Sequence, residues 1–200
     1  MGDFVDCLAG FIEAAGLQHP HVLGHSWGTT LALQLCRRHP SMTSSLVLVG
    51  AYAGWAGSLP PDEVQRRLGF ALTAADIVDA NQWDPTSMPG LFSDIMPADR
   101  AAELVVLMSD IRAPATRTMA RALAEADLRD ELARVAVPNL LVNGVADERS
   151  PVHVAEQLDR AIPGSTLTVL AGLGHECYLE SAAAFDAAVR PFLRTQAETR

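Results

Sequence analysis

Three side chains in this sequence have the types and the chain order required for nucleophilic acyl transfer. Ser26 lies in the pentapeptide GHSWG at residues 24–28, which matches Gly-x-Ser-x-Gly, and Asp147 and His175 follow it. A serine hydroxyl becomes a strong nucleophile only when a base takes its proton, and a histidine held by a carboxylate is a common base. We therefore predict a catalytic triad with Ser26 as the nucleophile, His175 as the base and Asp147 as the acid.

The surroundings of the pentapeptide indicate a sharp turn between a strand and a helix. Residues 21–24 read as a short strand after a proline, and residues 29–38 read as a helix that ends at a His-Pro pair. Such a turn places Ser26 at a helix N-terminus, where free N–H groups favour developing negative charge. The Trp27 backbone N–H is the predicted oxyanion donor. We expect a side chain at either flanking glycine to clash with the neighbouring strand and helix.

The other elements predict an α/β fold with one parallel sheet. Apolar spacing indicates a helix over residues 3–16, and continuous apolar runs indicate buried strands. The further predicted elements are strands at 45–50, 139–144 and 165–171, and helices at 151–162 and from about Ser181. Strands that alternate with helices form parallel sheets through right-handed crossovers. Ser26, Asp147 and His175 then all follow carboxyl ends of strands, the edge at which ligand sites form.

A helical insertion interrupts this alternation. Helical segments broken by several prolines fill the middle of the chain, so the predicted domains are a core of residues 1–52 and 136–200 and a helical cap of residues 53–135. Large apolar side chains of the cap could line a substrate pocket or simply form core, since both uses share helical spacing. The candidate substrate-binding residues are Trp55, Phe70, Trp83, Phe92, Met96 and Met108.

Three segments carry a resemblance to a known family. GHSWG at 24–28, VPNLLVNGVADERSP at 137–151 and GLGHECYLE at 172–180 resemble the α/β-hydrolase fold family. In that family the serine follows the fifth strand, the acid the seventh and the histidine the eighth, with a helical cap before the seventh. The resemblance implies a cofactor-independent serine hydrolase that cleaves a small ester, thioester or lactone through an acyl-enzyme. The resemblance also leaves three other activities of the family open: carbon–carbon bond hydrolysis, peroxidase-like chemistry and aminopeptidase activity.

The resemblance also implies strands that this sequence does not contain. Members of the family begin with four strands before the first helix seen here, and a loop among those strands donates the second oxyanion N–H. We therefore expect an N-terminally truncated fold in which residues 21–24 form a sheet edge prone to homodimer formation or aggregation. The alternative function is a weak or inactive hydrolase fragment that acts, if at all, as an interaction module.

Composition limits the partners and the compartment. The chain has 200 residues, a formal net charge of −9 and basic residues scattered along its length, so we expect no nucleic-acid partner. No apolar run approaches the roughly 18 residues of a membrane span, and no signal peptide is recognised. Three widely spaced cysteines predict neither disulfides nor a metal site and favour a reducing, cytoplasmic location. A small-molecule substrate is the expected partner.

Neighbouring residues offer alternatives to the predicted roles. Glu148 could compete with Asp147 as the acid, although a solvated side chain is expected there. His25 could act as a second base, but we expect it to pack beneath the turn. Cys177 could be a nucleophile or a redox group, and an inert thiol is the simpler interpretation. Four other histidines have no comparable position: His19, His21, His39 and His153.

Overall fold

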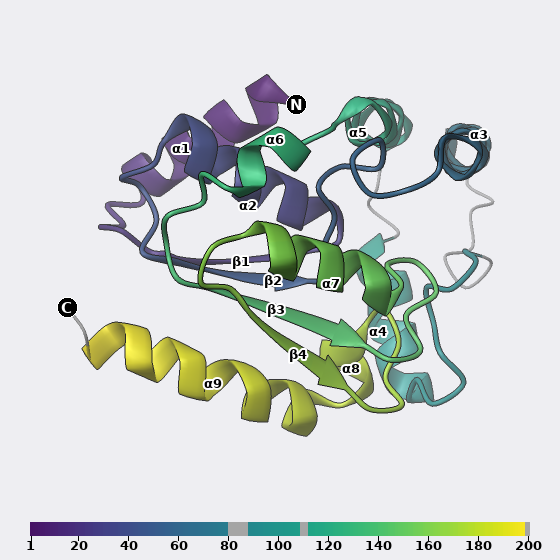
Figure 1. Cartoon of the computed structure of the whole chain (residues 1–200). Helices are drawn as coiled ribbons and strands as arrows, with labels where there is room; N and C mark the ends of the chain where they lie inside the picture. The colour runs from purple at the N-terminus through teal and green to yellow at the C-terminus, as the bar shows by residue number, and fades with distance from the viewer. Residues whose placement is uncertain (80–87, 109–111, 199–200) are drawn as a thin grey trace.

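The computed structural model describes residues 1–79, 88–108 and 112–198, and its centre is a four-stranded parallel sheet (Figure 1). The strands are β1 (His21–His25), β2 (Ser45–Val49), β3 (Asn139–Gly144) and β4 (Thr166–Leu170), in the order β1-β2-β3-β4. The register places Leu23 opposite Val47 and Leu48 opposite Leu141. Every residue of β2 and β3 is buried, as continuous apolar runs require of central strands.

Helices cover both faces of the sheet, which confirms the predicted α/β fold (Figure 1). On one face, α2 (Trp27–Arg38) and α7 (Val152–Ala161) pack against Leu46, Leu48 and Leu141. The long helix α9 (Ala182–Glu198) packs on the opposite face against alternate residues of the same strands. The first helix, α1 (Gly2–Ala14), packs on α2 and against Val22 of β1.

Four helices of the described residues lie between β2 and β3, in the segment predicted as a cap. They are α3 (Pro61–Asp79), α4 (Ala98–Met108), α5 (Ala113–Glu125) and α6 (Arg129–Leu132), and α3 lies beside α5. The side chains of Trp55, Val64 and Leu123 share one buried cluster with Leu48 of β2 and Leu158 of α7. The helical segment is therefore joined to the sheet by a continuous apolar core.

The element bounds differ slightly from expectation where local geometry decides them. The helix after the serine begins at Trp27, two residues earlier than predicted, because the turn leads directly into the helix. A short helix, α8 (Cys177–Glu180), follows His175 and was not predicted, since four residues are too few to show a helical period.

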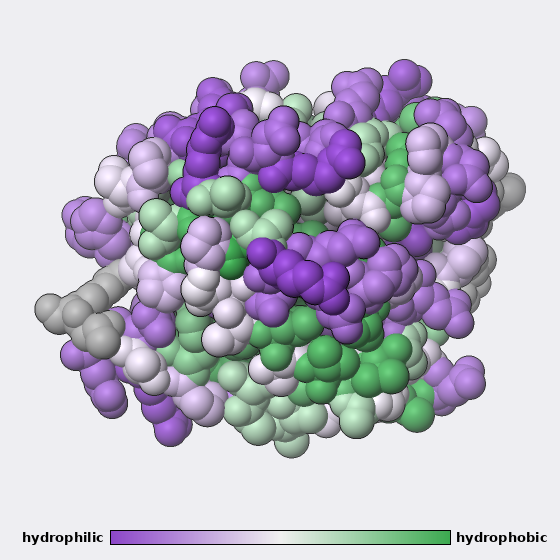
Figure 2. Space-filling model, in the orientation of Figure 1, coloured by the Kyte–Doolittle hydropathy of each residue, from purple (hydrophilic) through white to green (hydrophobic). Residues whose placement is uncertain are grey.

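The surface is unevenly polar. Figure 2 shows hydrophilic side chains over most of the upper half of this view and a hydrophobic area in the lower half, in the region where Figure 1 shows the end of β4 and α4. Exposed apolar residues of that part of the chain include Val106, Leu107, Val145 and Val169. Among the described helices, none has the length and apolarity needed to cross a membrane.

Candidate active site

Ser26 occupies a strained turn between β1 and α2. Its φ of 51° and ψ of −115° are unusual for a residue with a side chain, and its backbone N–H donates to the Val49 carbonyl at 2.8 Å. The helix begins at the next residue, so the Trp27 N–H is among the first-turn donors without an intrahelical acceptor. The turn therefore places the Ser26 side chain beside groups that can stabilise an oxyanion.

The two glycines of the pentapeptide have different environments, which corrects the expectation that both are sterically required. A Cβ at Gly24 would lie 2.5 Å from the Gly28 carbonyl oxygen, so β1 can approach α2 only because this position lacks a side chain. A Cβ at Gly28 would have no atom within 4 Å. Gly28 lies on the open side of the helix start, where the described structure leaves room.

Asp147 and His175 form a buried, bonded pair. The Nδ1 of His175 lies 3.0 Å from Asp147 Oδ1 and 2.9 Å from Oδ2. His175 is 2% exposed and Asp147 is 4% exposed. A carboxylate accepts hydrogen bonds only, so the proton of the neutral imidazole lies on Nδ1. Nε2 then carries the lone pair that a general base needs.

The loop after β3 orients the carboxylate. Oδ1 of Asp147 accepts the backbone N–H groups of Arg149 at 2.9 Å and of Ser150 at 2.7 Å. The Asn143 side chain donates a hydrogen bond to the Ser150 carbonyl and so holds the same loop against the end of β3. Glu148, the alternative acid, is exposed and makes none of these bonds among the described residues. The structure thus brings Asp147, and not Glu148, to His175.

A second carboxylate fixes the loop that carries the imidazole. The Gly174 N–H donates to Oε2 of Glu180, which lies at the end of α8 and is buried. On the other side, the ring packs against Gly50, which has a φ of 53°; a Cβ there would be 3.0 Å from His175 Cε1. Sequence reasoning missed both residues, although a glutamate five positions after the histidine was visible in the motif.

Ser26 and His175 approach each other at the carboxyl end of β2. The Ser26 backbone binds Val49 there, and the His175 ring lies over the next residue, Gly50. Across the described residues, no hydrogen bond joins Ser26 Oγ to His175 Nε2. Catalytic hydrogen bonds of free enzymes are often long and tighten only when substrate is bound.

His25 packs against the base rather than beneath the turn alone. Its Nε2–H donates to the His175 backbone carbonyl at 3.0 Å, and the centroids of the two rings are 4.7 Å apart. Burial and the nearby His175 lower the pKa of His25 to about 3. His25 is therefore neutral near pH 7, and it does not oppose the positive charge that His175 would take up as a base.

Glu176 and Tyr178 complete this cluster. Glu176 Oε2 lies 3.9 Å from His25 Nδ1, and burial raises the pKa of Glu176 despite a hydrogen bond from Tyr178. Ligand atoms of His25, His175 and Glu176 lie within 4.8 Å of one another, near enough to share a metal ion. Each histidine donates one ring N–H to a protein oxygen, His25 to the His175 carbonyl and His175 to Asp147, and these two bonds hold the His175 ring and its loop in place.

The cysteines do not form a reactive centre in the structure. Cys177 is 1% exposed, and burial raises the pKa of its thiol to about 12, far above the range of reactive cysteines. Cys36 is also buried, and burial raises the pKa of its thiol too. Cys7 is exposed on α1.

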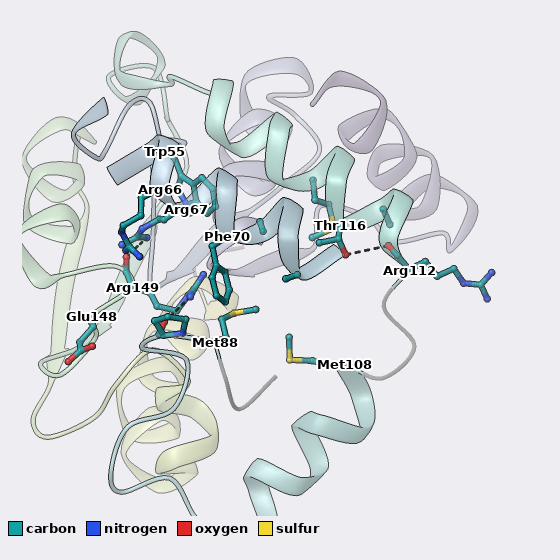
Figure 3. A pocket seen from close by; sticks show the side chains of 15 residues that line it. Trp55, Arg66, Arg67, Phe70, Met88, Met108, Arg112, Thr116, Glu148 and Arg149 are labelled. Atoms are coloured by element: carbon teal, nitrogen blue, oxygen red, sulfur yellow. Dashed lines mark hydrogen bonds between the residues drawn. The ribbon is translucent and has the colours of Figure 1, made fainter. Parts of the chain in front are cut away.

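A pocket of about 540 Å³ lies among α3, α5 and the loop after Asp147 (Figure 3). Its volume is typical of small-molecule sites. Of the predicted substrate-binding residues, Trp55, Phe70 and Met108 line it; Phe92 and Met96 are not in its lining, and Trp83 falls outside the described residues. Residues of the lining that the sequence did not indicate include Arg67, Met88 and Arg149.

Hydrogen bonds through Thr29 and Tyr52 connect the turn at Ser26 to residues that line the pocket. Thr29 Oγ1 donates to the Ser26 carbonyl at 2.6 Å and accepts the Tyr52 N–H at 3.1 Å. The Tyr52 hydroxyl donates to the Arg149 carbonyl and accepts from Arg67, and burial raises its pKa to about 12. Tyr52 thus connects the backbone of the Ser26 turn to two residues of the lining, Arg67 and Arg149, whereas Ser26 and His175 are not themselves in the lining.

Comparison with known proteins gives a consistent result. The family described as alpha/beta hydrolase fold matches residues 1–182 of the chain. RutD of Caulobacter sp. (strain K31), which is named as a carbamate hydrolase, is 28% identical over 197 residues, covering 96% of this chain and 72% of RutD. The pimeloyl-[acyl-carrier protein] methyl ester esterase of Neisseria meningitidis serogroup A is 30% identical over 179 residues, covering 86% of this chain and 56% of the esterase. The esterase EaEST of Exiguobacterium antarcticum superposes with a TM-score of 0.77 at 24% identity, covering 95% of this chain and 72% of EaEST.

Proposed function

The chain belongs to the alpha/beta hydrolase fold family and is an enzyme of that family, and on this premise we propose that it is a serine hydrolase. Its proposed substrate is a small ester, thioester or lactone, cleaved through an acyl-enzyme intermediate. The observation that carries the proposal is the buried bond between His175 Nδ1 and Asp147, which leaves Nε2 as a proton acceptor at the end of β2 where Ser26 also lies.

The proposed reaction has two halves. Ser26 Oγ attacks the substrate carbonyl carbon while His175 Nε2 takes the hydroxyl proton, and the Trp27 N–H stabilises the oxyanion. The tetrahedral intermediate collapses, the leaving group takes the proton from His175, and the acyl group stays on Ser26. A water molecule then attacks the acyl carbon and gives a proton to His175. The second tetrahedral intermediate collapses, Ser26 Oγ leaves and takes this proton from His175, and the acid product is released.

Asp147 has an orienting and electrostatic role in this scheme. It fixes the imidazole tautomer and stabilises the cation that forms when His175 takes the proton. His25 assists as a positioning residue, because it holds the His175 backbone and stays neutral. The names of the relatives support the reaction class, since RutD is named for carbamates and the Neisseria protein for a methyl ester.

The acyl-enzyme is open to direct detection. Purified chain mixed with p-nitrophenyl acetate and quenched in acid should gain the mass of one acetyl group on the peptide that contains Ser26. An Asp147→Asn variant should accumulate it about 10⁴-fold more slowly, because asparagine favours the wrong imidazole tautomer. Acetylation at other residues alone, or an unchanged rate in the asparagine variant, would contradict the proposed mechanism.

A further inference from the structure

Arg149 brings a positive charge into the pocket. Its side chain lines the cavity and is half-buried, and its guanidinium donates one hydrogen bond, to the Pro89 carbonyl at 3.0 Å. Within the described residues, no carboxylate lies within ion-pair distance of this guanidinium. Burial lowers the pKa of Arg149, but an arginine side chain stays charged at neutral pH.

The other charged residues of the lining are engaged or directed elsewhere. Arg66 and Arg67 both bind Glu63, and these hydrogen bonds lower the pKa of Glu63 to about 2. Figure 3 shows Arg112 extending away from the cavity and the Glu148 carboxylate on its outer side. Among the described residues of the lining, Arg149 is therefore the cation that is available to bind a ligand.

The walls around this charge are mostly apolar. Trp55, Phe70, Met88 and Met108 line the cavity, and the Arg149 side chain lies on the side of Phe70 and Met88 (Figure 3). A charge in such surroundings loses hydration, and a bound anion of opposite charge would restore the lost interaction. One guanidinium fits one carboxylate, because its N–H groups match the two oxygens of that anion.

We propose that this pocket recognises a carboxylate on the substrate through Arg149, with the apolar chain of the substrate against the aromatic and methionine walls. The inference rests on the proposed function and narrows the substrate to an ester or thioester that also carries a free carboxylate, of which the half-ester of a dicarboxylic acid is the simplest case. The placement supports it, since Arg149 is two residues from Asp147 and its backbone N–H binds the same carboxylate oxygen as His175. Two residues span at most about 7 Å.

Binding measured without turnover tests the anion site separately from the chemistry. Isothermal titration calorimetry should show hexanoate binding at least tenfold more tightly than hexanamide, which has the same chain without the charge. Arg149→Met should remove this preference, a loss of about ten- to a hundredfold for a charged hydrogen bond. Arg160→Met is the matched control, because Arg160 is exposed on α7 and pairs with Glu156 outside the pocket.

The same comparison extends to turnover. The wild type should hydrolyse the mono-p-nitrophenyl ester of adipic acid with a higher kcat/KM than p-nitrophenyl hexanoate, and Arg149→Met should lose this difference mainly through KM. Equal binding of hexanoate and hexanamide by the wild type would overturn the inference, as would a hexanoate preference that persists in Arg149→Met. A chain that binds hexanoate through Arg149 but forms no acyl-enzyme would contradict the proposed function and leave the anion site standing.

Discussion

His25 donates its Nε2–H to the backbone carbonyl of His175 at 3.0 Å, so the residue before the proposed nucleophile holds the loop of the proposed base. This bond connects β1 to the segment after β4, which lies at the opposite edge of the sheet. A neutral His25 leaves His175 free to take up a proton, because a second imidazolium this close would oppose protonation of His175.

The low pKa of His25 predicts sensitivity to acid. In the unfolded chain this histidine binds a proton below its ordinary pKa of 6.5, whereas the folded chain binds one only near pH 3. The stability that it contributes is complete above pH 6.5 and declines as the pH falls toward 3, by at most about 1.4 kcal/mol per pH unit. The side chain keeps 21% exposure, so we expect a shallower slope. Urea unfolding of the wild type and His25→Gln between about pH 7 and pH 4 checks this; equal slopes would contradict it.

The strained backbone of Ser26 predicts that glycine at this position gives a more stable protein than alanine does. A positive φ at a residue with a side chain costs about 1–3 kcal/mol, and glycine avoids this cost. Ser26→Gly should therefore exceed Ser26→Ala in free energy of unfolding by about 1 kcal/mol, after the entropy of glycine in the unfolded chain is subtracted. Chemical denaturation of the two inactive variants provides the comparison. A less stable glycine variant would show that the turn is not strained.

The two glycines of the turn should respond oppositely to alanine. At Gly24 the new methyl group would meet the Gly28 backbone at 2.5 Å, and we expect a loss of about 1–3 kcal/mol or more. At Gly28 the methyl group meets nothing within 4 Å and replaces a helical glycine, so stability should rise by up to about 0.5–1 kcal/mol. Thermal melts of Gly24→Ala and Gly28→Ala decide the point, and equal losses in both would refute the assigned geometry.

The position of β1 predicts self-association. In the described sheet β1 pairs with β2 alone, and Leu23 on it is 51% exposed. An edge strand with unpaired backbone groups favours pairing with a second copy. Sedimentation velocity should show a dimer whose population falls in Leu23→Lys. Leu107→Lys is the control, because Leu107 is also exposed and lies on the helix α4, outside the sheet. A wild-type monomer at all concentrations would contradict this.

The strands could be predicted because a continuous apolar run forms a strand that is buried on both faces. The run SLVLVG at residues 45–50 has no polar side to face water after its first residue, and β2 is indeed buried throughout. Parallel topology then places the ends of β1, β3 and β4 at one edge, so the proximity of Asp147 to His175 follows from chain order. The roles of Ser26, Asp147 and His175 stay a prediction.

The pocket was less accessible to sequence reasoning. Arg67 and Arg149 are 82 positions apart in the chain, and only the packing of α3 against the loop after β3 brings the Arg67 guanidinium to the Arg149 carbonyl. Basic residues that are scattered along the sequence thus meet at the cavity. Helical spacing in the cap indicated apolar faces but not which side chains turn inward, because crossing angles between helices depend on packing.

The central claim is that Ser26 is an activated nucleophile. The direct measurement is covalent labelling of the purified chain by a fluorophosphonate probe, with the modified peptide identified by mass spectrometry. The account predicts one label on Ser26 in the wild type and none in Ser26→Ala, because only a serine beside a competent base attacks phosphorus at a useful rate. Absence of labelling in a folded wild-type chain, or equal labelling of the alanine variant, would contradict it.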